Sequence, residues 1–177
     1  MVAPAPGWSI RQFRPADLPS CRKLYIEGLL GGKLAENDTG LDIDDIESAY
    51  MHADGNSFWV AQMSTGEIVG MIGVQHHDQG LGQVRRLRVA ATHRRRGIGK
   101  ALLETAVKFC RENQYLKVAL DTFIERSGAV EMFQKLGFTP GDTRVAAGKE
   151  LMYFYLDLYS GPPAQRQQDQ GFLETAG

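Results

Sequence analysis

The sequence predicts one sheet protein of the α/β (α+β) class, and three observations support this. Short apolar segments typical of strands alternate with amphipathic helical patterns along the chain. In the middle, at 84–110, a strand, a glycine-containing turn and a long helix follow one another directly. The 177 residues suffice for one domain with a full-sized core. We expect a flexible N-terminus over 1–7, a single domain over 8–160 and a mobile Pro/Gln-rich tail over 161–177.

The first half of the chain combines strands with two helices. The segment after the first strand offers Asp17 as a helix N-cap, with Leu24, Tyr25 and Leu29 on one helical face. After a Gly-rich loop, the acidic first turn of DIDDIESAYMHA predicts a second short helix. Period-two alternation predicts a strand at 8–13. Two further strands are predicted at 57–63 and 67–75, joined by the turn STG, and a fourth at 84–89 after the polar loop HHDQGLGQ.

The second half is organised around one strong helical pattern. Apolar residues recur at helical spacing from Ile98 to Cys110. A buried strand at 116–122 follows, then a helix at 127–137 that Gly137 closes. The aromatic segment 150–158 predicts a last strand.

Charge and composition narrow the classes of function. The chain is 43% apolar and 23% charged, with a formal net charge of −1, which argues against a protein built mainly to bind nucleic acid. The basic residues are instead concentrated at 85–100, which favours a small anionic partner. The longest apolar run, 68–74, is far shorter than the ~20 residues of a membrane span, and the N-terminus has no signal-peptide pattern. We therefore expect a soluble cytoplasmic protein whose Cys21 and Cys110 are buried and reduced.

The segment RRRGIGK, at 94–100, predicts a phosphate site. A helix N-terminus presents unpaired backbone N–H groups, and glycines let an anion approach them closely. The spacing excludes a Walker A loop, because no glycine stands five positions before Gly99 and Ala101 replaces the required hydroxyl residue. It also fails the dinucleotide pattern GxGxxG, because Leu102 occupies the last glycine position. The pattern that remains is [QR]xxGxG, after a strand that ends in LxV.

This pattern leads to a family. The segment LRVAATHRRRGIGKALLETAVKF, at 87–109, resembles the coenzyme-A-binding motif of the GNAT N-acetyltransferase superfamily. VALDT followed by GAVEMFQKLGF, at 118–138, resembles the fifth strand and fourth helix of that family, and the order of elements matches over roughly 8–158. The resemblance implies a mixed, mostly antiparallel sheet of about seven strands, with strands four and five splayed apart, flanked by about four helices.

Within the superfamily, the helix-three and strand-five block is similar to that of the camello-like branch. That branch includes cysteine-conjugate N-acetyltransferases and N-acetylaspartate synthase. Its members usually carry a membrane-associating hydrophobic segment after the first helix. This chain has the hydrophilic GGKLAENDTGLDIDD, at 31–45, in that place, so we expect no membrane attachment.

The resemblance implies acetyl-CoA as the cofactor and no metal. It implies that the Val89 backbone amide polarises the acetyl carbonyl as an oxyanion develops. The cofactor-binding residues implied are Leu87, Arg88, Val89, Arg94, Arg95, Arg96, Gly97, Ile98, Gly99, Lys100, Ala129 and Phe133.

The sequence departs from the family pattern at the two positions that usually hold the general base and the general acid. Many members have a glutamate base on strand four, where this chain has Gln83, which can orient a water but cannot accept a proton at neutral pH. Many have a tyrosine acid in the fourth helix, where this chain has Phe133. The candidates for a replacement base are Asp121, His77 and the neighbouring His76.

Substrate-binding residues are expected on strand four and on the last strand. Arg85 and Arg86 are predicted to point to opposite faces, and we favour Arg86 as the partner of a substrate carboxylate. Tyr153 and Tyr155 share one face of the last strand and are candidates for the pocket wall or for core positions.

Three classes of function remain from the sequence. The first is an N-acetyltransferase for a small-molecule amine such as an amino acid, an amino-acid conjugate or a polyamine, with a protein lysine or N-terminus as the variant acceptor. The second is a coenzyme-A-binding module without turnover, consistent with Gln83 and Phe133. The third, a nucleic-acid binder, is disfavoured by net charge and glycine spacing. The aromatic strand 150–158 is compatible with a homodimer.

Overall fold

A single seven-stranded sheet forms the body of the protein, in the order β1-β2-β3-β4-β5-β7-β6. The structure is a computed structural model and describes residues 7–28, 38–123, 127–146 and 148–159. The mobile tail predicted over 161–177, and all but Gly7 of the flexible N-terminus, lie outside these residues. The strands are β1 (Trp8–Gln12), β2 (Ser57–Met63), β3 (Ile68–His77), β4 (Leu81–Val89), β5 (Lys117–Phe123), β6 (Thr139–Ala146) and β7 (Lys149–Asp157).

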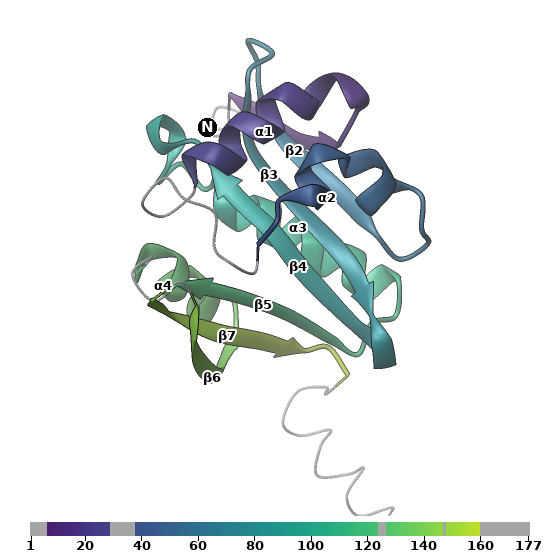
Figure 1. Ribbon diagram of the computed structural model, residues 1–177, viewed down its shortest axis with the longest axis vertical. Coiled ribbons are helices and arrows are strands. Elements are labelled where there is room, and N and C mark those ends of the chain that lie inside the picture. The colour runs from purple at the N-terminus through teal and green to yellow at the C-terminus, as the bar shows by residue number, and fades with distance from the viewer. Residues whose placement is uncertain (1–6, 29–37, 124–126, 147, 160–177) are drawn as a thin grey trace, which may run out of the picture.

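Helices cover both faces of the sheet (Figure 1). One face carries the first helices and the other carries the long α3 together with α4. The longer helices are α1 (Leu18–Glu27), α3 (Ile98–Glu112) and α4 (Ser127–Lys135), and the shorter ones include α2 (Leu41–Asp44), the π-type turn η3 (Glu47–Met51) and the 3₁₀ turn η5 (Ala91–His93).

Two apolar cores follow from this layering. The periodic residues Leu102, Leu103, Ala106 and Cys110 of α3 are fully buried against the sheet. Burial of a leucine side chain of this kind contributes about 2 kcal/mol of transfer free energy. On the other face, side chains of α1 and η3 pack on β2 and β3, with Tyr50 and Phe58 in edge contact at 4.9 Å. One core thus lies on each face of the sheet.

Most pairing is antiparallel, and β4 and β5 form the one parallel pair among the described strands. The long helix α3 makes the crossover that such a pair requires. The expected mixed sheet of seven strands, splayed between β4 and β5, is thus confirmed. Both cysteines are free and buried, as predicted.

Three elements differ from the prediction. The loop expected at 76–83 belongs largely to strands, because β3 continues to His77 and β4 begins at Leu81. The single helix expected after Gly40 is divided into α2 and η3, with a break at Asp45, whose φ of −142° and ψ of 74° are not helical. Strand β6 was not predicted from the residues, since Pro140 and Gly141 are typical turn residues; here they accompany a register shift on an edge strand.

Candidate active site

Strands β4 and β5 separate to form a wedge-shaped gap in the sheet. Their register begins at Leu81–Lys117 and ends at the pair Gln83–Ala119. Beyond this pair β5 continues in register with β7 alone, and the two strands diverge as Figure 1 shows. Gln83 therefore lies at the closed end of the gap, and Val89 lies at its open end.

The Val89 amide faces the gap. Ala90 N donates to Val69 O at 2.8 Å, and in the same register Val89 lies opposite Gly70. Antiparallel pairs alternate between hydrogen-bonded and non-hydrogen-bonded positions, so the N–H of Val89 points away from β3. An amide placed in this way can donate to a ligand oxygen within the gap.

The start of α3 lies next to Val89, at the open end of the gap. Gly97 caps the helix with φ of 81°, and Arg95 before it also has a positive φ, of 61°. The first helical N–H groups have no partner within the helix, and the N-terminal end carries a partial positive charge. Arg94 and Arg96 are exposed beside these groups. The turn thus combines backbone donors and mobile cations in the manner an anion requires.

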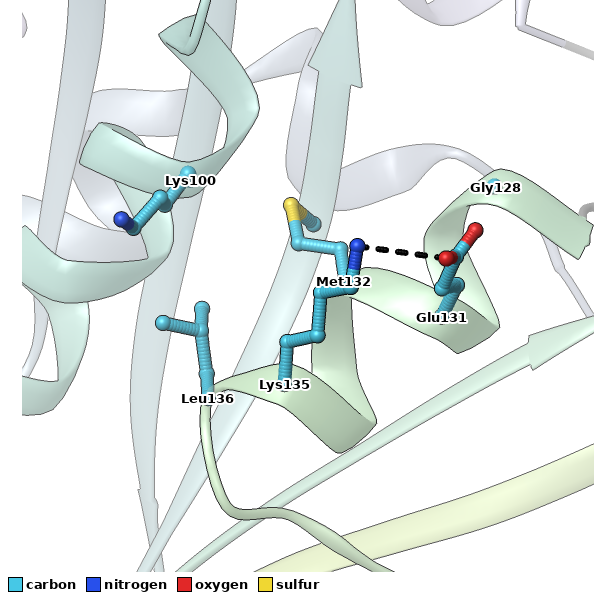
Figure 2. A pocket seen from close by; sticks show the side chains of 6 residues that line it. All are labelled: Lys100, Gly128, Glu131, Met132, Lys135 and Leu136. Carbon is cyan, nitrogen blue, oxygen red and sulfur yellow. Dashed lines mark ion pairs between the residues drawn. The ribbon is translucent and has the colours of Figure 1, made fainter.

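A groove of about 250 Å³ continues from this turn between α3 and α4. Figure 2 shows Lys100 on α3 opposite Met132 and Lys135 on α4, with Lys135 paired to Glu131 at 3.2 Å. The remaining lining residues are Gly128 and Leu136. Met132 also lies close to the start of α3, because a Cβ on Gly99 would meet its sulfur at 3.7 Å.

Phe133 occupies a core position. Its ring is 3% exposed and packs against Phe138 and Phe154, with centroid distances of 6.2 and 5.4 Å. Ala129 is half-buried beside the same core. The side chain that α4 presents to the start of α3 is Met132. Phe133, which the resemblance implied as a cofactor-binding residue, packs in the core. The reason is helical phase, since consecutive residues of a helix point about 100° apart.

A polar cluster lies on the α1/α2 face of the sheet, beside the gap. Asp121 on β5 is directly opposite Tyr153 on β7, and the guanidinium of Arg144 lies 5.1 Å from the centre of the Tyr153 ring. Tyr155, two residues farther along β7, lies opposite Ala119 and carries Lys117 over its ring at 5.1 Å. Asp121 and Tyr153 thus lie beside the gap, and Tyr155 lies level with its closed end.

The carboxyl of Asp121 has a raised pKa. Its side chain contacts solvent at the edge of the gap, and the protein atoms around it still remove enough hydration to raise the pKa above the usual 3.8. The positive charges of Arg144 and Arg85 oppose this rise without cancelling it. A carboxylate with a raised pKa is better matched to general-base work at neutral pH than an ordinary one.

The other predicted proton-handling residues are farther from the open end. His77 is exposed at the end of β3, opposite Leu81. His76 stacks on Tyr115 at 5.4 Å, with 21° between the ring planes. Both histidines thus lie beyond the closed end of the gap, whereas Gln83 stands at it.

A bulge in β4 brings Arg85 and Arg86 to the same face. The register with β3 shifts between Met71 and Gly73, so that Arg86 and Leu87 together take the place of one residue. Arg86 has a φ of 60°, a left-handed conformation. The prediction that the two arginines point to opposite faces was wrong, because it assumed unbroken alternation.

Arg86 is held by two carboxylates of the chain itself. Its guanidinium donates to Asp38 at 2.6 and 2.8 Å and to Asp42 at 2.5 and 2.9 Å, and its side chain is 7% exposed. It also lies over the Tyr25 ring, 5.0 Å from its centre. These are the carboxylates that Arg86 binds in the structure, instead of the substrate carboxylate that the sequence predicted. Arg85, by contrast, donates a hydrogen bond to the side-chain oxygen of Gln75 at 3.0 Å.

The residues around the gap suit coenzyme A in two respects. The glycine-capped turn offers backbone donors for a pyrophosphate, and a Cβ on Gly97 would point into open space where an anion could lie. The gap also offers the Val89 amide, near which an acyl carbonyl could be placed. No cluster of three or more metal-ligating side chains occurs among the residues that the structure describes.

Several residues of this region were missed by the sequence analysis. Met132 and Lys135 share a face of α4 that helical spacing could have revealed. Asp38, Asp42 and Arg144 are far from the motif in sequence, and no local pattern marks them.

Comparison with known proteins identifies the family. The model of the acetyltransferase (GNAT) family matches residues 20–138. The chain therefore belongs to the GNAT acetyltransferase family.

Similar curated proteins include N-acetyltransferase 8F1 of Mus musculus, 39% identical over 102 residues, which are 55% of this chain and 46% of that protein. N-acetylaspartate synthetase of Danio rerio is 36% identical over 98 residues, which are 55% of this chain and 34% of that protein. The chain thus spans about half the length, or less, of these relatives. Among solved structures, yncA, a putative acetyltransferase from Salmonella typhimurium with its cofactor acetyl-CoA, has a TM-score of 0.73 at 18% identity, covering 89% of this chain and 96% of that chain.

The helices give no sign of a membrane span. In the described part of the chain, none of them is both long enough and apolar enough to cross a bilayer.

Proposed function

We propose that the chain is an acetyl-CoA-dependent N-acetyltransferase that acts on the primary amine of a small molecule. The observation that carries the proposal is the gap between β4 and β5, which runs from Gln83 to the glycine-capped start of α3 with the Val89 amide facing into it. Bound acetyl-CoA would supply a thioester carbonyl that an amine can attack. The named relatives, an N-acetyltransferase and an N-acetylaspartate synthetase, support the same reaction class.

Each group of residues has a role in the proposed reaction that follows from its position. Backbone N–H groups at 97–100, with Arg94 to Arg96 beside them, bind the pyrophosphate, and Lys100 and Lys135 supply charge along the groove. The Val89 N–H stabilises negative charge on the acetyl oxygen. The transfer breaks the thioester C–S bond, forms the amide C–N bond and moves one amine proton, which finally resides on the free thiol.

Asp121 is the base that we propose for this proton. It borders the gap on the face opposite α3, and its raised pKa improves its proton affinity. Gln83, at the closed end, orients the water through which the proton passes. His77, beyond the closed end, is the less favoured candidate.

The charges of the same face favour an acceptor that carries an anionic group. Arg85 and Arg144 both act on Asp121, and neither forms an ion pair with a described carboxylate, whereas Arg86 is held by Asp38 and Asp42. Such a face suits an amino acid or its conjugate better than a polyamine. Tyr153 and Tyr155 form its wall.

Two measurements test the proposal. Acetyl-CoA at 100 times its dissociation constant should stabilise the fold by about 2.7 kcal/mol, which a thermal-shift titration detects. Release of free thiol is then followed over a panel of amino acids, amino-acid conjugates, polyamines and peptides. Stabilisation without thiol release from any acceptor would favour the alternative of a coenzyme-A-binding module without turnover, and release with peptides alone would favour a protein acceptor. Absence of stabilisation would refute the proposal.

The cytoplasmic location and the homodimer stay predictions. Cell fractionation checks the first, and size-exclusion chromatography with light scattering checks the second.

A further inference from the structure

We infer that Arg86 is a positioning residue that fastens the segment Asp38–Asp44 to the bulge of β4 and thereby fixes the direction of the Val89 amide. The inference rests on the proposed function, in which that amide polarises the acetyl carbonyl. Arg86 itself touches neither the acyl group nor the amine in this role, and it acts through the backbone that follows it.

The bulge decides which way the end of β4 faces. The bulge adds one residue to β4. Without it, each side chain from Leu87 onward would point to the opposite face of the sheet, because side chains alternate along a strand. With it, Leu87 and Val89 pack against the α3 core, and Val89 lies against Gly99. The position of the Val89 amide toward the gap therefore depends on the bulge.

The bulge needs support, since Arg86 adopts a left-handed φ of 60° that a side-chain-bearing residue rarely takes. The support comes from four hydrogen bonds between its guanidinium and the carboxylates of Asp38 and Asp42. Planar, bidentate pairs of this kind fix direction as well as distance.

The acidic segment is shaped to supply these carboxylates. Gly40, between the two aspartates, has a φ of 66°, and its N–H donates to Asp38 at 3.0 Å. This turn presents Asp38 and Asp42 to the same guanidinium. Asp42 also accepts a hydrogen bond from the hydroxyl of the buried Tyr50 at 2.6 Å, which anchors the segment in the second core.

Two surfaces meet at this contact. The segment Asp38–Asp44 belongs to the α1/α2 side, where the acceptor is proposed to bind, and the bulge belongs to the strand proposed to hold the acetyl group (Figure 1). Among the described residues, no hydrogen bond or ion pair joins the phosphate-binding turn at 94–100 to Asp38, Arg86 or Asp42. Loss of the Arg86 pairs should therefore impair acetyl transfer far more than coenzyme A binding.

The test compares Arg86→Gln with Arg11→Gln. Arg11 forms a similar bidentate pair with Asp17, at 2.7 and 2.8 Å, on strand β1 away from the gap, so it controls for the loss of a partly buried ion pair. We expect Arg86→Gln to lower kcat at least tenfold with less than threefold change in the coenzyme A Kd. Arg11→Gln should change both by less than twofold. Equal kcat in wild type and Arg86→Gln, or a matching loss in Arg11→Gln, would overturn the inference.

A second variant controls for the possibility that Arg86→Gln lowers kcat by destabilising the fold. Arg86→Gln leaves two carboxylates without their partner, and the triple variant Arg86→Met, Asp38→Asn, Asp42→Asn removes the charges together. It should fold and bind coenzyme A, and it should show the same loss of kcat. Wild-type kcat in this variant would equally overturn the inference.

A spectroscopic readout separates this inference from the proposed function. With acetyl-CoA labelled with ¹³C at the acetyl carbonyl, difference infrared spectroscopy should show a carbonyl band at lower frequency in the wild type than in solution, and most of that shift should be lost in Arg86→Gln. Failure of the wild type to bind acetyl-CoA would count against the proposed function. A wild-type shift that Arg86→Gln retains would count against the positioning role alone.

Discussion

Gly99, at the start of α3, lies against Val89 at the end of β4, such that a Cβ on the glycine would meet Val89 Cγ2 at 3.6 Å. This is an ordinary van der Waals distance, and the φ of Gly99 is not positive. Gly97 is the opposite case, because its φ is 81° and the space beside its Cα is open. The two glycines of the motif therefore have different physical roles.

Gly97→Val and Gly99→Ala should separate these roles. Valine at 97 is strained at positive φ, at a cost of about 1–3 kcal/mol, and its side chain enters the space assigned to the pyrophosphate. We expect at least a tenfold weaker coenzyme A affinity by isothermal titration calorimetry. Alanine at 99 should keep the affinity within threefold. Equal loss in both variants would contradict the assignment of the anion to the Gly97 side.

Asp121→Asn should abolish most activity without harming the fold. A positioned base contributes roughly 10²–10⁴-fold to rate, so kcat should fall by that order. In the wild type, kcat/KM should rise with pH as the carboxyl ionises, and the variant should lack this limb of the pH–rate profile. A profile that is unchanged in Asp121→Asn would exclude this carboxyl as the base.

The same pKa predicts the direction of a stability effect. The folded pKa of Asp121 is raised, so the protein loses stability as pH rises from the unfolded pKa of about 3.8 through the folded value. At pH 7 the neutral amide should therefore be tolerated at least as well as the carboxylate. Thermal unfolding at pH 7 should give a melting temperature for Asp121→Asn that is equal to or above that of the wild type.

Asp38→Asn should show the reverse dependence on pH. The hydrogen bonds from Arg86 lower the pKa of Asp38 to about 2, against a penalty from burial. The ionised carboxylate therefore stabilises the fold above about pH 4, and this contribution is lost as pH falls toward 2. Urea unfolding should show a loss of about 2 kcal/mol in the variant at pH 7, because one pKa unit corresponds to about 1.4 kcal/mol. The difference should shrink at pH 3, and a constant difference would contradict the ionic origin.

The thiols of Cys21 and Cys110 should be unreactive in the native protein. Burial raises the pKa of both Cys21 and Cys110 to about 12, so the reactive thiolate is scarce at pH 8. Dithiobis(nitrobenzoate) should react with two thiols per chain in guanidinium chloride and with almost none without it. Fast native reaction at either cysteine would contradict the buried position. Slow background reaction also makes this reagent suitable for measuring thiol release.

Local patterns predicted the parts of the fold that local physics determines. The apolar run between turn residues located β2 to the residue, because this strand is buried on both faces. The apolar spacing after Ile98 located α3, because this helix buries one face. The glycine spacing marked the helix start, since the positive φ of Gly97 favours that residue. The identification of the fold came from the same short segments.

Features that depend on contacts between distant parts of the sequence could not be predicted from local patterns. The bulge at Arg86 leaves no mark in VRRLRV, whose residues alternate plausibly with or without it. The pairing of Arg86 with Asp38 and Asp42 joins positions more than 40 residues apart. Phe133 was placed by resemblance, and the packing of its ring on Phe154, from a later strand, puts it in the core.

The order of the strands has a consequence for how the molecule melts. Residues before the gap build β1 to β4, residues after it build β5 to β7, and the chain passes between these two groups once, through α3. Among the described residues, strand pairing across the divide comprises three residue pairs, from Leu81–Lys117 to Gln83–Ala119, with one further main-chain hydrogen bond from Leu116 N to Gly80 O. A ligand that contacts both groups of strands adds interactions between them at the place where they share the fewest main-chain hydrogen bonds. Its binding should therefore sharpen the unfolding transition, in addition to moving it to higher temperature.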